Sequence, residues 1–166
     1  MRIARDNRGV TLIEVMTVVA IIGVLAIILG FSFRGWVGKY RVEDETKRIY
    51  ADLTDARARA MQKKRVTFVD LAEHRYRTFE DSAPAPDGDE ALTGADTRVA
   101  DTETKYAIDQ VMTGGVTQFR FDREGLASAT GRIRLVSSLS PDYDCITIAR
   151  TRIRMGRFHG GICQEK

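Results

Sequence analysis

The chain has 166 residues, of which 43% are hydrophobic and 30% are charged, and its formal net charge at pH 7 is +3. This length accommodates one globular domain of ordinary size, with enough apolar residues for a further apolar segment outside the core. Most of the net positive charge comes from residues 1–9, where Arg2, Arg5 and Arg8 outweigh Asp6. The net charge of the chain therefore does not indicate a nucleic-acid-binding protein.

An uncharged apolar run from Val15 to Phe33 forms the first predicted element. As a helix rising about 1.5 Å per residue, it would span nearly the whole hydrocarbon core of a bilayer, which is roughly 30 Å thick. Basic residues precede it, so the positive-inside tendency places the N-terminus in the cytoplasm and the domain after residue 38 outside it. Because no small-residue cleavage site follows the run, we expect the anchor to be retained. A buried core helix of the same composition is the alternative.

Glu14 breaks the apolar pattern near the start of this segment. An ionised carboxylate in hydrocarbon is unfavourable unless it is paired or neutralised. Cleavage of the chain between Gly9 and Val10 would create a partner, because the new α-amino group of Val10 would lie about one helical turn before Glu14. Pairing of Glu14 with the amine of a neighbouring subunit would then couple assembly to cleavage.

The segment from Arg8 to Val15, RGVTLIEV, closely resembles the type III signal sequence of type IV prepilins and type II secretion pseudopilins. A short basic leader, Gly9 before the cut, a hydrophobic Val10 and the position of Glu14 carry this resemblance. It implies cleavage by a prepilin peptidase, N-methylation of the Val10 amine, and packing of the helices in the core of a filament. The implied partners are the prepilin peptidase, other pilins or pseudopilins, and an inner-membrane assembly platform. The usual first mature residue is Phe, so Val10 departs from the pattern.

Apolar residues recur at helical spacing from Tyr40 to Met61, so we expect the helix to continue to about Gln62. This second half is amphipathic: its apolar stripe is expected to pack on a sheet, while its charged residues face water or a neighbouring subunit. Residues 1–9 would then be the cleaved leader, residues 10–37 the transmembrane and filament-core helix, and residues 38–62 the amphipathic continuation.

After Lys63 the period becomes that of β-strands, with β-branched and aromatic residues alternating with polar ones. Residues 81–104 are poor in large apolar residues and rich in carboxylates, which predicts an exposed acidic loop. The fold class is therefore α+β, with a long N-terminal helix, membrane-spanning in its first half, packed on an antiparallel β-rich, pilin-like domain over residues 63–166. The predicted strands cover residues 66–71, 74–80, 105–112, 116–122, 131–138 and 145–155.

The order of these elements, with FRFDREGLA near residue 120 and TRIRMGRF near the C-terminus, resembles the H-type pseudopilin (GspH) and FimT minor-pilin family. The resemblance implies a structural subunit of a type IV pilus or of a type II secretion pseudopilus. It also implies a single-pass protein of the inner membrane with a periplasmic or extracellular C-terminal domain, which enters a filament on assembly.

Cys145 and Cys163 are the two cysteines of the chain. A metal site would need about four ligands at closer spacing, and His74 and His159 do not complete such a set. If the domain lies in an oxidising compartment, the pair predicts a disulfide. Two buried, reduced thiols are the alternative.

A cluster of arginines near the C-terminus is the candidate binding site of this sequence. Three of them alternate with other residues and would lie on one face of a strand, where guanidinium groups contact DNA phosphates. FimT-like minor pilins of competence systems are associated with DNA binding through a basic C-terminal segment, which TRIRMGRF resembles. A solvated strand face that makes salt bridges is the alternative, and Arg132 and Arg134 would extend the patch if their strand is adjacent. The cluster consists of Arg150, Arg152, Arg154 and Arg157.

Motifs of catalysis are absent from the sequence, which contains no GxSxG, HExxH or GxxxxGK[ST]. We therefore expect no enzymatic activity, no catalytic residues, no cofactor and no metal. The oxygen-rich segment 87–90 lacks the spacing of an EF-hand, so calcium binding is a minor alternative.

Overall fold

The computed structural model describes residues 10–86 and 88–166, without the side chains of residues 29–34. The chain divides into two compact units, Met1–Val37 and Gly38–Lys166. The predicted leader, including Gly9, lies outside the described residues.

The helix α1 runs from Leu12 to Lys63 over 52 residues. It ends where the sequence changes from helical to strand periodicity, and Lys64 has a φ of 54°, the left-handed conformation typical of the residue that follows a helix. Lys63 lies in the last turn, where a positive charge interacts favourably with the helix dipole.

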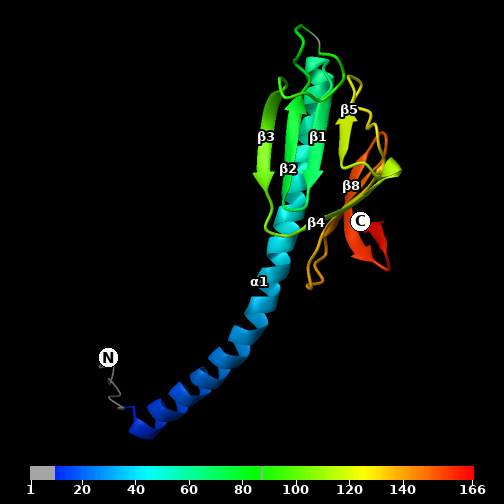
Figure 1. Cartoon of the computed structure of the whole chain (residues 1–166). Helices are drawn as coiled ribbons and strands as arrows, with labels where there is room; N and C mark the ends of the chain where they lie inside the picture. The colour runs from blue at the N-terminus through cyan, green and yellow to red at the C-terminus, as the bar shows by residue number, and fades with distance from the viewer. Residues whose placement is uncertain (1–9, 87) are drawn as a thin grey trace, which may run out of the picture. The chain divides into compact units, whose positions relative to one another are not determined.

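Two antiparallel sheets make up the rest of the second unit (Figure 1). The first sheet has the order β3-β2-β1-β5 and lies beside the second part of α1 in Figure 1. The second sheet has the order β4-β6-β7-β8-β9, with a short 3-10 helix, η1 (Thr113–Gly115), after β4. The strands are β1 (Thr67–Ala72), β2 (Arg75–Glu80), β3 (Thr97–Glu103), β4 (Ile108–Met112), β5 (Gln118–Phe121), β6 (Gly131–Leu135), β7 (Cys145–Ile148), β8 (Ile153–His159) and β9 (Ile162–Glu165).

A stripe along the second part of α1 supplies the helical side of the core. Its residues recur every three or four positions, and each is at most 3% exposed. Thr46 lies within the stripe, but its hydroxyl donates a hydrogen bond to the carbonyl oxygen of Val42 at 2.8 Å, so it is satisfied without water. The same core contains Phe119 and Phe121 of β5 and Ile133 of β6. The predicted α+β, pilin-like fold class is confirmed. The buried apolar residues of the stripe are Val42, Ile49, Leu53, Ala56 and Ala60.

The predicted acidic loop is wrong in its second half, because residues 97–103 form β3 and pair with β2. The first half of this segment is not simply exposed, because two of its carboxylates are buried. Asp81 and Asp96 are 0% and 8% exposed. The Asp96 carboxylate accepts backbone N–H groups from Ser82 and Ala83 at 3.1 Å and from Thr93 at 2.7 Å. Two buried carboxylates therefore hold this segment by accepting its backbone donors, which a reading of the loop as solvated charge missed.

The predicted strand over 145–155 is two strands, since a turn separates β7 from β8. The turn is closed by a hydrogen bond from the Ala149 N–H to the Arg152 carbonyl oxygen at 2.8 Å. Ile148 and Ile153 form the last pair of the hairpin ladder. Arginine continues to occur at every second position from Arg150 to Arg154, which favoured one strand, but the buried apolar positions change from even (Ile146 and Ile148) to odd (Ile153) across the turn.

Candidate functional surfaces

The start of α1 positions Glu14. The backbone N–H of Glu14 donates to the Thr11 hydroxyl at 3.3 Å and to the Thr11 carbonyl oxygen at 3.1 Å. Thr11 is thus the N-cap, and Thr11-x-x-Glu14 matches the capping-box pattern in which an acidic residue occupies the third helical position. A carboxylate in the first turn also lies at the positive end of the helix dipole. Helix capping accounts for an acidic residue here, alongside any role in assembly.

The large apolar side chains of Val10 and of the first part of α1, from Leu12 to Ile28, are between 49% and 79% exposed. They occur at consecutive positions and therefore surround the helix, unlike the single stripe of its second part. Such a surface needs a cover of lipid or of other apolar helices. Within the described residues, no helix is long and apolar enough to cross a membrane. The predicted anchor continues through residues 29–34, whose side chains are outside the described set.

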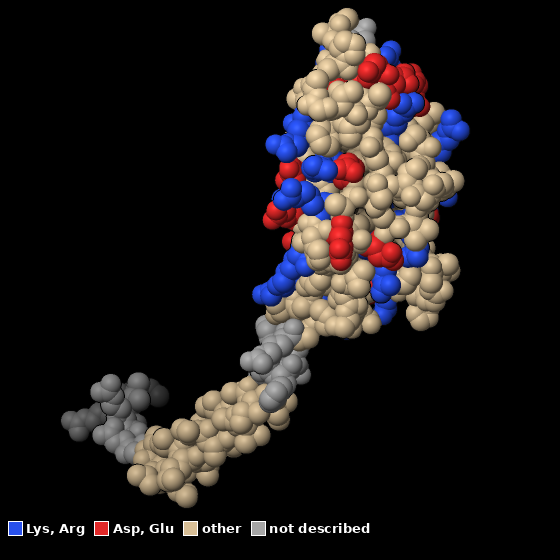
Figure 2. Space-filling view, viewed as in Figure 1, with Lys and Arg blue, Asp and Glu red and all other residues tan. Residues whose placement is uncertain are grey.

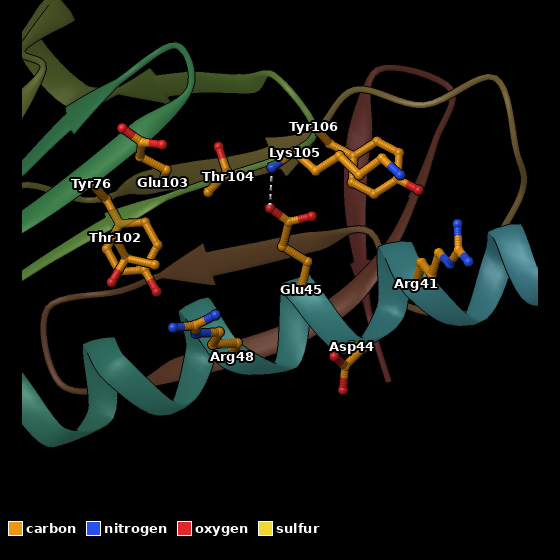
Figure 3. A pocket seen from close by; sticks show the side chains of 10 residues that line it. All are labelled: Arg41, Asp44, Glu45, Arg48, Tyr76, Thr102, Glu103, Thr104, Lys105 and Tyr106. Atoms are coloured by element: carbon orange, nitrogen blue, oxygen red, sulfur yellow. Dashed lines mark hydrogen bonds between the residues drawn. The ribbon is translucent and has the colours of Figure 1, made fainter.

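A cavity of about 310 Å³ lies between the second part of α1 and the segment that joins β3 to β4 (Figure 3). Glu45 of the helix accepts the backbone N–H of Lys105 at 2.6 Å, which ties the two elements together. Tyr76 lines the cavity and donates a hydrogen bond to Asp52. Burial raises the pKa of Tyr76, and the hydrogen bond to Asp52 adds to the effect. The other lining residues include both guanidinium and carboxylate groups, so the cavity favours no single class of charged ligand.

No set of three or more His, Cys, Asp or Glu side chains within the described part of the chain is placed to hold a metal ion.

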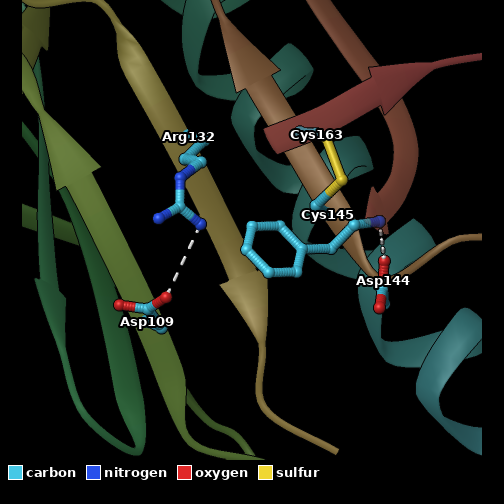
Figure 4. Close-up of a disulfide and its surroundings, with 6 residues drawn as sticks. Asp109, Arg132, Asp144, Cys145 and Cys163 are labelled. Atoms are coloured by element: carbon cyan, nitrogen blue, oxygen red, sulfur yellow. Dashed lines mark hydrogen bonds and ion pairs between the residues drawn. A yellow bond between two sulfur atoms is a disulfide. The ribbon is translucent and has the colours of Figure 1, made fainter. Parts of the chain in front are cut away.

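The predicted disulfide is present: Cys145 of β7 is bonded to Cys163 of β9, with their Cα atoms 6.0 Å apart (Figure 4). The bond links the two strands that flank β8 in the sheet order. Beside it, the Asp144 carboxylate accepts the backbone N–H of Phe158 at 2.6 Å. The C-terminal strand is therefore held by a covalent link as well as by its ladder with β8.

The C-terminal arginines do not lie on one face of one strand, so this prediction was wrong. Arg150 and Arg152 lie in the turn between β7 and β8 and are exposed. Arg154 lies on β8 and is paired with Glu165 at 2.9 Å. Arg157 is three positions further along β8, so its side chain leaves the opposite face of the sheet. The physical reason is the turn at residues 149–152, which interrupts the predicted row.

Arg132 and Arg134 lie on β6, which pairs with β7 and not with β8. They are nevertheless close to the C-terminal segment through Phe158, because both guanidinium groups stack on its ring, at 4.6 and 3.9 Å from the ring centre. Arg132 and Arg134 were predicted only to extend the arginine patch, and their contact with Phe158 was not predicted. The missing information was the strand order, which a single sequence does not supply.

Comparison with protein families gives two matches that bear on these surfaces. The prokaryotic N-terminal methylation motif matches residues 4–30, which include Val10 and Glu14. The family described as type II transport protein GspH matches residues 45–151, more than half of the chain. The comparison with curated proteins found no match, and neither did the comparison with solved structures.

Proposed function

The chain belongs to the GspH family of type II transport proteins, and from this premise we propose that it is a minor pilin or pseudopilin that is cut between Gly9 and Val10 and then assembled into a filament. The family is one of structural pseudopilins rather than enzymes. The proposed processing enzyme is a prepilin peptidase, and the proposed product carries an N-methyl group on Val10.

The contrast between the two parts of α1 is the observation that carries this proposal. From Val10 to Ile28 the apolar side chains are exposed around the helix, whereas from Val42 to Ala60 a single stripe is buried in the β-rich domain. A subunit of this kind uses one part of its helix to complete its own core. The other part offers an apolar surface to lipid before assembly and to neighbouring helices afterwards.

The charged form of Glu14 is unfavourable in a membrane but can be stabilised in a filament. The lipid phase disfavours a charged carboxylate, while a filament offers it the amine of a neighbouring Val10. The capping geometry at Thr11 holds the Glu14 backbone in the first helical turn, close to the new N-terminus that cleavage would create. We propose that Glu14 recognises the processed N-terminus of an adjacent subunit, with the β-rich domain on the periplasmic or extracellular side.

The test is the intact mass of the membrane-extracted protein, with and without a prepilin peptidase. We expect a loss that matches residues 1–9, with or without one added methyl group. Gly9→Leu should prevent the loss, while Gly23→Ala should leave it unchanged, because an added Cβ at Gly23 meets no atom within 4 Å. A chain that stays uncut in the presence of the peptidase would refute the proposed processing and leave Val10 and Glu14 without their assigned roles.

DNA binding by the C-terminal arginines is a second proposal with narrower support. Arg150 and Arg152 are exposed in the β7–β8 turn, whereas Arg154 is paired with Glu165. Against it, Figure 2 shows Lys and Arg interspersed with Asp and Glu over the β-rich domain, without a continuous basic stripe on that face. A salt-dependent gel shift that is lost in Arg150→Ala/Arg152→Ala would support this function, and equal shifts for wild type and variant would remove it.

A further inference from the structure

The second sheet has one face in the core and one face away from it, which we call the outer face. Ile133 of β6 and Ile146 of β7 are directly opposite in the ladder, and each is 1% exposed, so they define the core face. Residues at the alternate positions point the other way. The register places them in rows across the strands. One row contains Val111, Arg132, Thr147 and Arg154, and the next contains Asp109, Arg134, Cys145 and Gly156.

The main feature of the outer face is a pair of guanidinium groups that both lie over one aromatic ring. Arg132 and Arg134 both lie over the ring of Phe158, which fixes the planes of their guanidinium groups while leaving N–H groups at the edges of those planes. This arrangement prepares them for a planar acceptor such as a carboxylate, because less side-chain freedom is lost on binding.

Unsatisfied polar atoms gather at the same place. Nη1 of Arg132, Nε of Arg134 and Oγ1 of Thr147 are buried and lack a hydrogen-bond partner within the described residues. The Asp109 carboxylate lies 3.6 Å from Nη1 of Arg132, an ion pair that is too long for a hydrogen bond (Figure 4). These three atoms are themselves covered, so a carboxylate from another molecule would bind the remaining N–H groups of Arg132 and Arg134, whose side chains are half-buried.

An apolar dent of about 300 Å³ lies next to Arg132. Val111 and Ile162 line it and are 52% and 61% exposed, and Cys163 of the disulfide contributes to it. Exposed apolar side chains around a depression, beside a pair of cations, form a surface that is both apolar and positively charged.

We propose that the outer face is a docking surface for a peptide segment of a partner protein in which a carboxylate side chain stands next to a large apolar side chain. Arg132 and Arg134 bind the carboxylate, and the dent beside Val111 and Ile162 receives the apolar side chain. This proposal goes beyond filament membership and does not depend on cleavage at Gly9.

A peptide fits the outer face better than a nucleic acid does. The carboxylates of Asp109 and Glu165 stand among its arginines, and they would repel a phosphate backbone. The face of the Phe158 ring beneath the two guanidinium groups is not open to a nucleobase. A single acidic side chain, by contrast, needs only the two stacked guanidinium groups and tolerates carboxylates nearby.

The test is a nuclear magnetic resonance titration of the full-length protein in detergent micelles. The probe is a synthetic hexapeptide with one glutamate between leucines, and the matched probe has glutamine in place of the glutamate. A single-stranded oligonucleotide is titrated in parallel. We expect the acidic peptide to shift the resonances of β6, β8 and Ile162, and the glutamine peptide to bind roughly tenfold more weakly. Arg134→Gln should weaken binding of the acidic peptide by a similar factor.

Arg98→Gln is the matched control, because Arg98 is an exposed arginine on the edge strand of the other sheet, paired with Asp101 at 3.0 Å. It should bind the acidic peptide as wild type does. Equal affinity for the two peptides, no shifts on the outer face, or equal losses in Arg134→Gln and Arg98→Gln would each overturn the proposal. Stronger binding of the oligonucleotide at the same residues would overturn it in favour of nucleic acid.

Discussion

The hydroxyl of Tyr76 on β2 donates a hydrogen bond to the carboxylate of Asp52 on α1. Tyr76 is 1% exposed, so this bond joins the first sheet to the helix at the edge of the core. Burial raises the pKa of Tyr76, and the hydrogen bond to Asp52 raises it further. Tyr76 also lines the cavity between the helix and the β3–β4 connection, so its bond to Asp52 holds one wall of that cavity in place.

Tyr76→Phe should lower the free energy of unfolding at neutral pH by roughly 1–2 kcal/mol, because Asp52 loses its donor. The pKa of Tyr76 in the folded state is above its unfolded value of about 10. The stability from this group is therefore complete below pH ~10 and is lost as the pH rises through the folded pKa. The variant should accordingly show a shallower alkaline decline in urea unfolding followed by circular dichroism.

Tyr143→Phe serves as the control for this prediction. The Tyr143 ring lies 5.6 Å from the Lys47 ammonium group, and the substitution keeps that ring. It should leave stability at neutral pH near that of wild type and retain the alkaline decline caused by Tyr76. Identical alkaline slopes for the two variants would contradict the role assigned to the Tyr76–Asp52 bond.

Asp96→Asn should loosen residues 82–96 and lower the free energy of unfolding by about 1–2 kcal/mol. An asparagine offers one acceptor oxygen, and its amide group would face backbone donors that now bind the carboxylate. Burial raises the pKa of Asp96, but the hydrogen bonds from Thr93, Ser82 and Ala83 outweigh it and lower the pKa overall. This stability is present above the unfolded pKa of about 4 and is lost as the pH falls through the folded pKa.

Hydrogen exchange and urea unfolding across the acidic range measure both effects of Asp96→Asn. The loop amides should exchange faster, and the loss of stability in acid should be shallower than in wild type. Asp89→Asn is the matched control, since Asp89 is exposed and accepts the nearby N–H of Ala91 at 3.0 Å. If Asp89→Asn lowers the free energy of unfolding and speeds loop exchange as much as Asp96→Asn does, the loop is not held by the buried carboxylate.

Periodicity predicted the elements whose side chains alternate between a buried and an exposed environment. The helical stripe from Val42 to Ala60 and the hairpin of β1 and β2 belong to this class, because burial on one face dictates the spacing of apolar residues. The strand β3 was missed because it is an edge strand with mostly polar side chains, and its pairing with β2 is made by backbone groups that every sequence has.

The candidate sites that are local in sequence could also be predicted, whereas those that depend on strand order could not. The N-terminal methylation motif is local in sequence, so it could be predicted without the fold, and the roles of Gly9, Val10 and Glu14 within it stay predictions. The disulfide was predicted because the chain has two cysteines. The arrangement of Arg132, Arg134 and Phe158 depends on strand order and register. The turn at residues 149–152, which separates the C-terminal arginines, has no glycine or proline to signal it.

Removing the disulfide through Cys145→Ala/Cys163→Ala should lower the free energy of unfolding by roughly 3 kcal/mol in the chain-entropy description. The loop closed by the bond spans a sequence separation of 18 residues. Because β9 otherwise pairs only with β8, its amides should show the largest increase in hydrogen exchange.

Wild-type protein treated with a reductant should match the double variant in both measurements. A midpoint of unfolding that the reductant leaves unchanged would show that the ladder between β8 and β9 is sufficient by itself. Gly156→Ala offers an independent test of that ladder, because the added Cβ would lie 2.1 Å from the Gln164 carbonyl oxygen. It should increase exchange in β9 while the disulfide remains intact.

Glu14→Gln should leave cleavage after Gly9 intact and lower incorporation into filaments by about tenfold or more. The glutamine keeps the size of the side chain and the backbone cap from Thr11, but it removes the charge that is proposed to pair with a neighbouring Val10 amine. Glu14→Asp retains the charge on a shorter side chain and should recover part of the incorporation. The measurements are intact mass, for cleavage, and the fraction of protein in sheared filaments, for assembly.

An uncut Glu14→Gln chain would assign Glu14 to recognition by the peptidase. Normal filaments would leave it a helix-capping residue, since the neutral side chain can still occupy the third helical position.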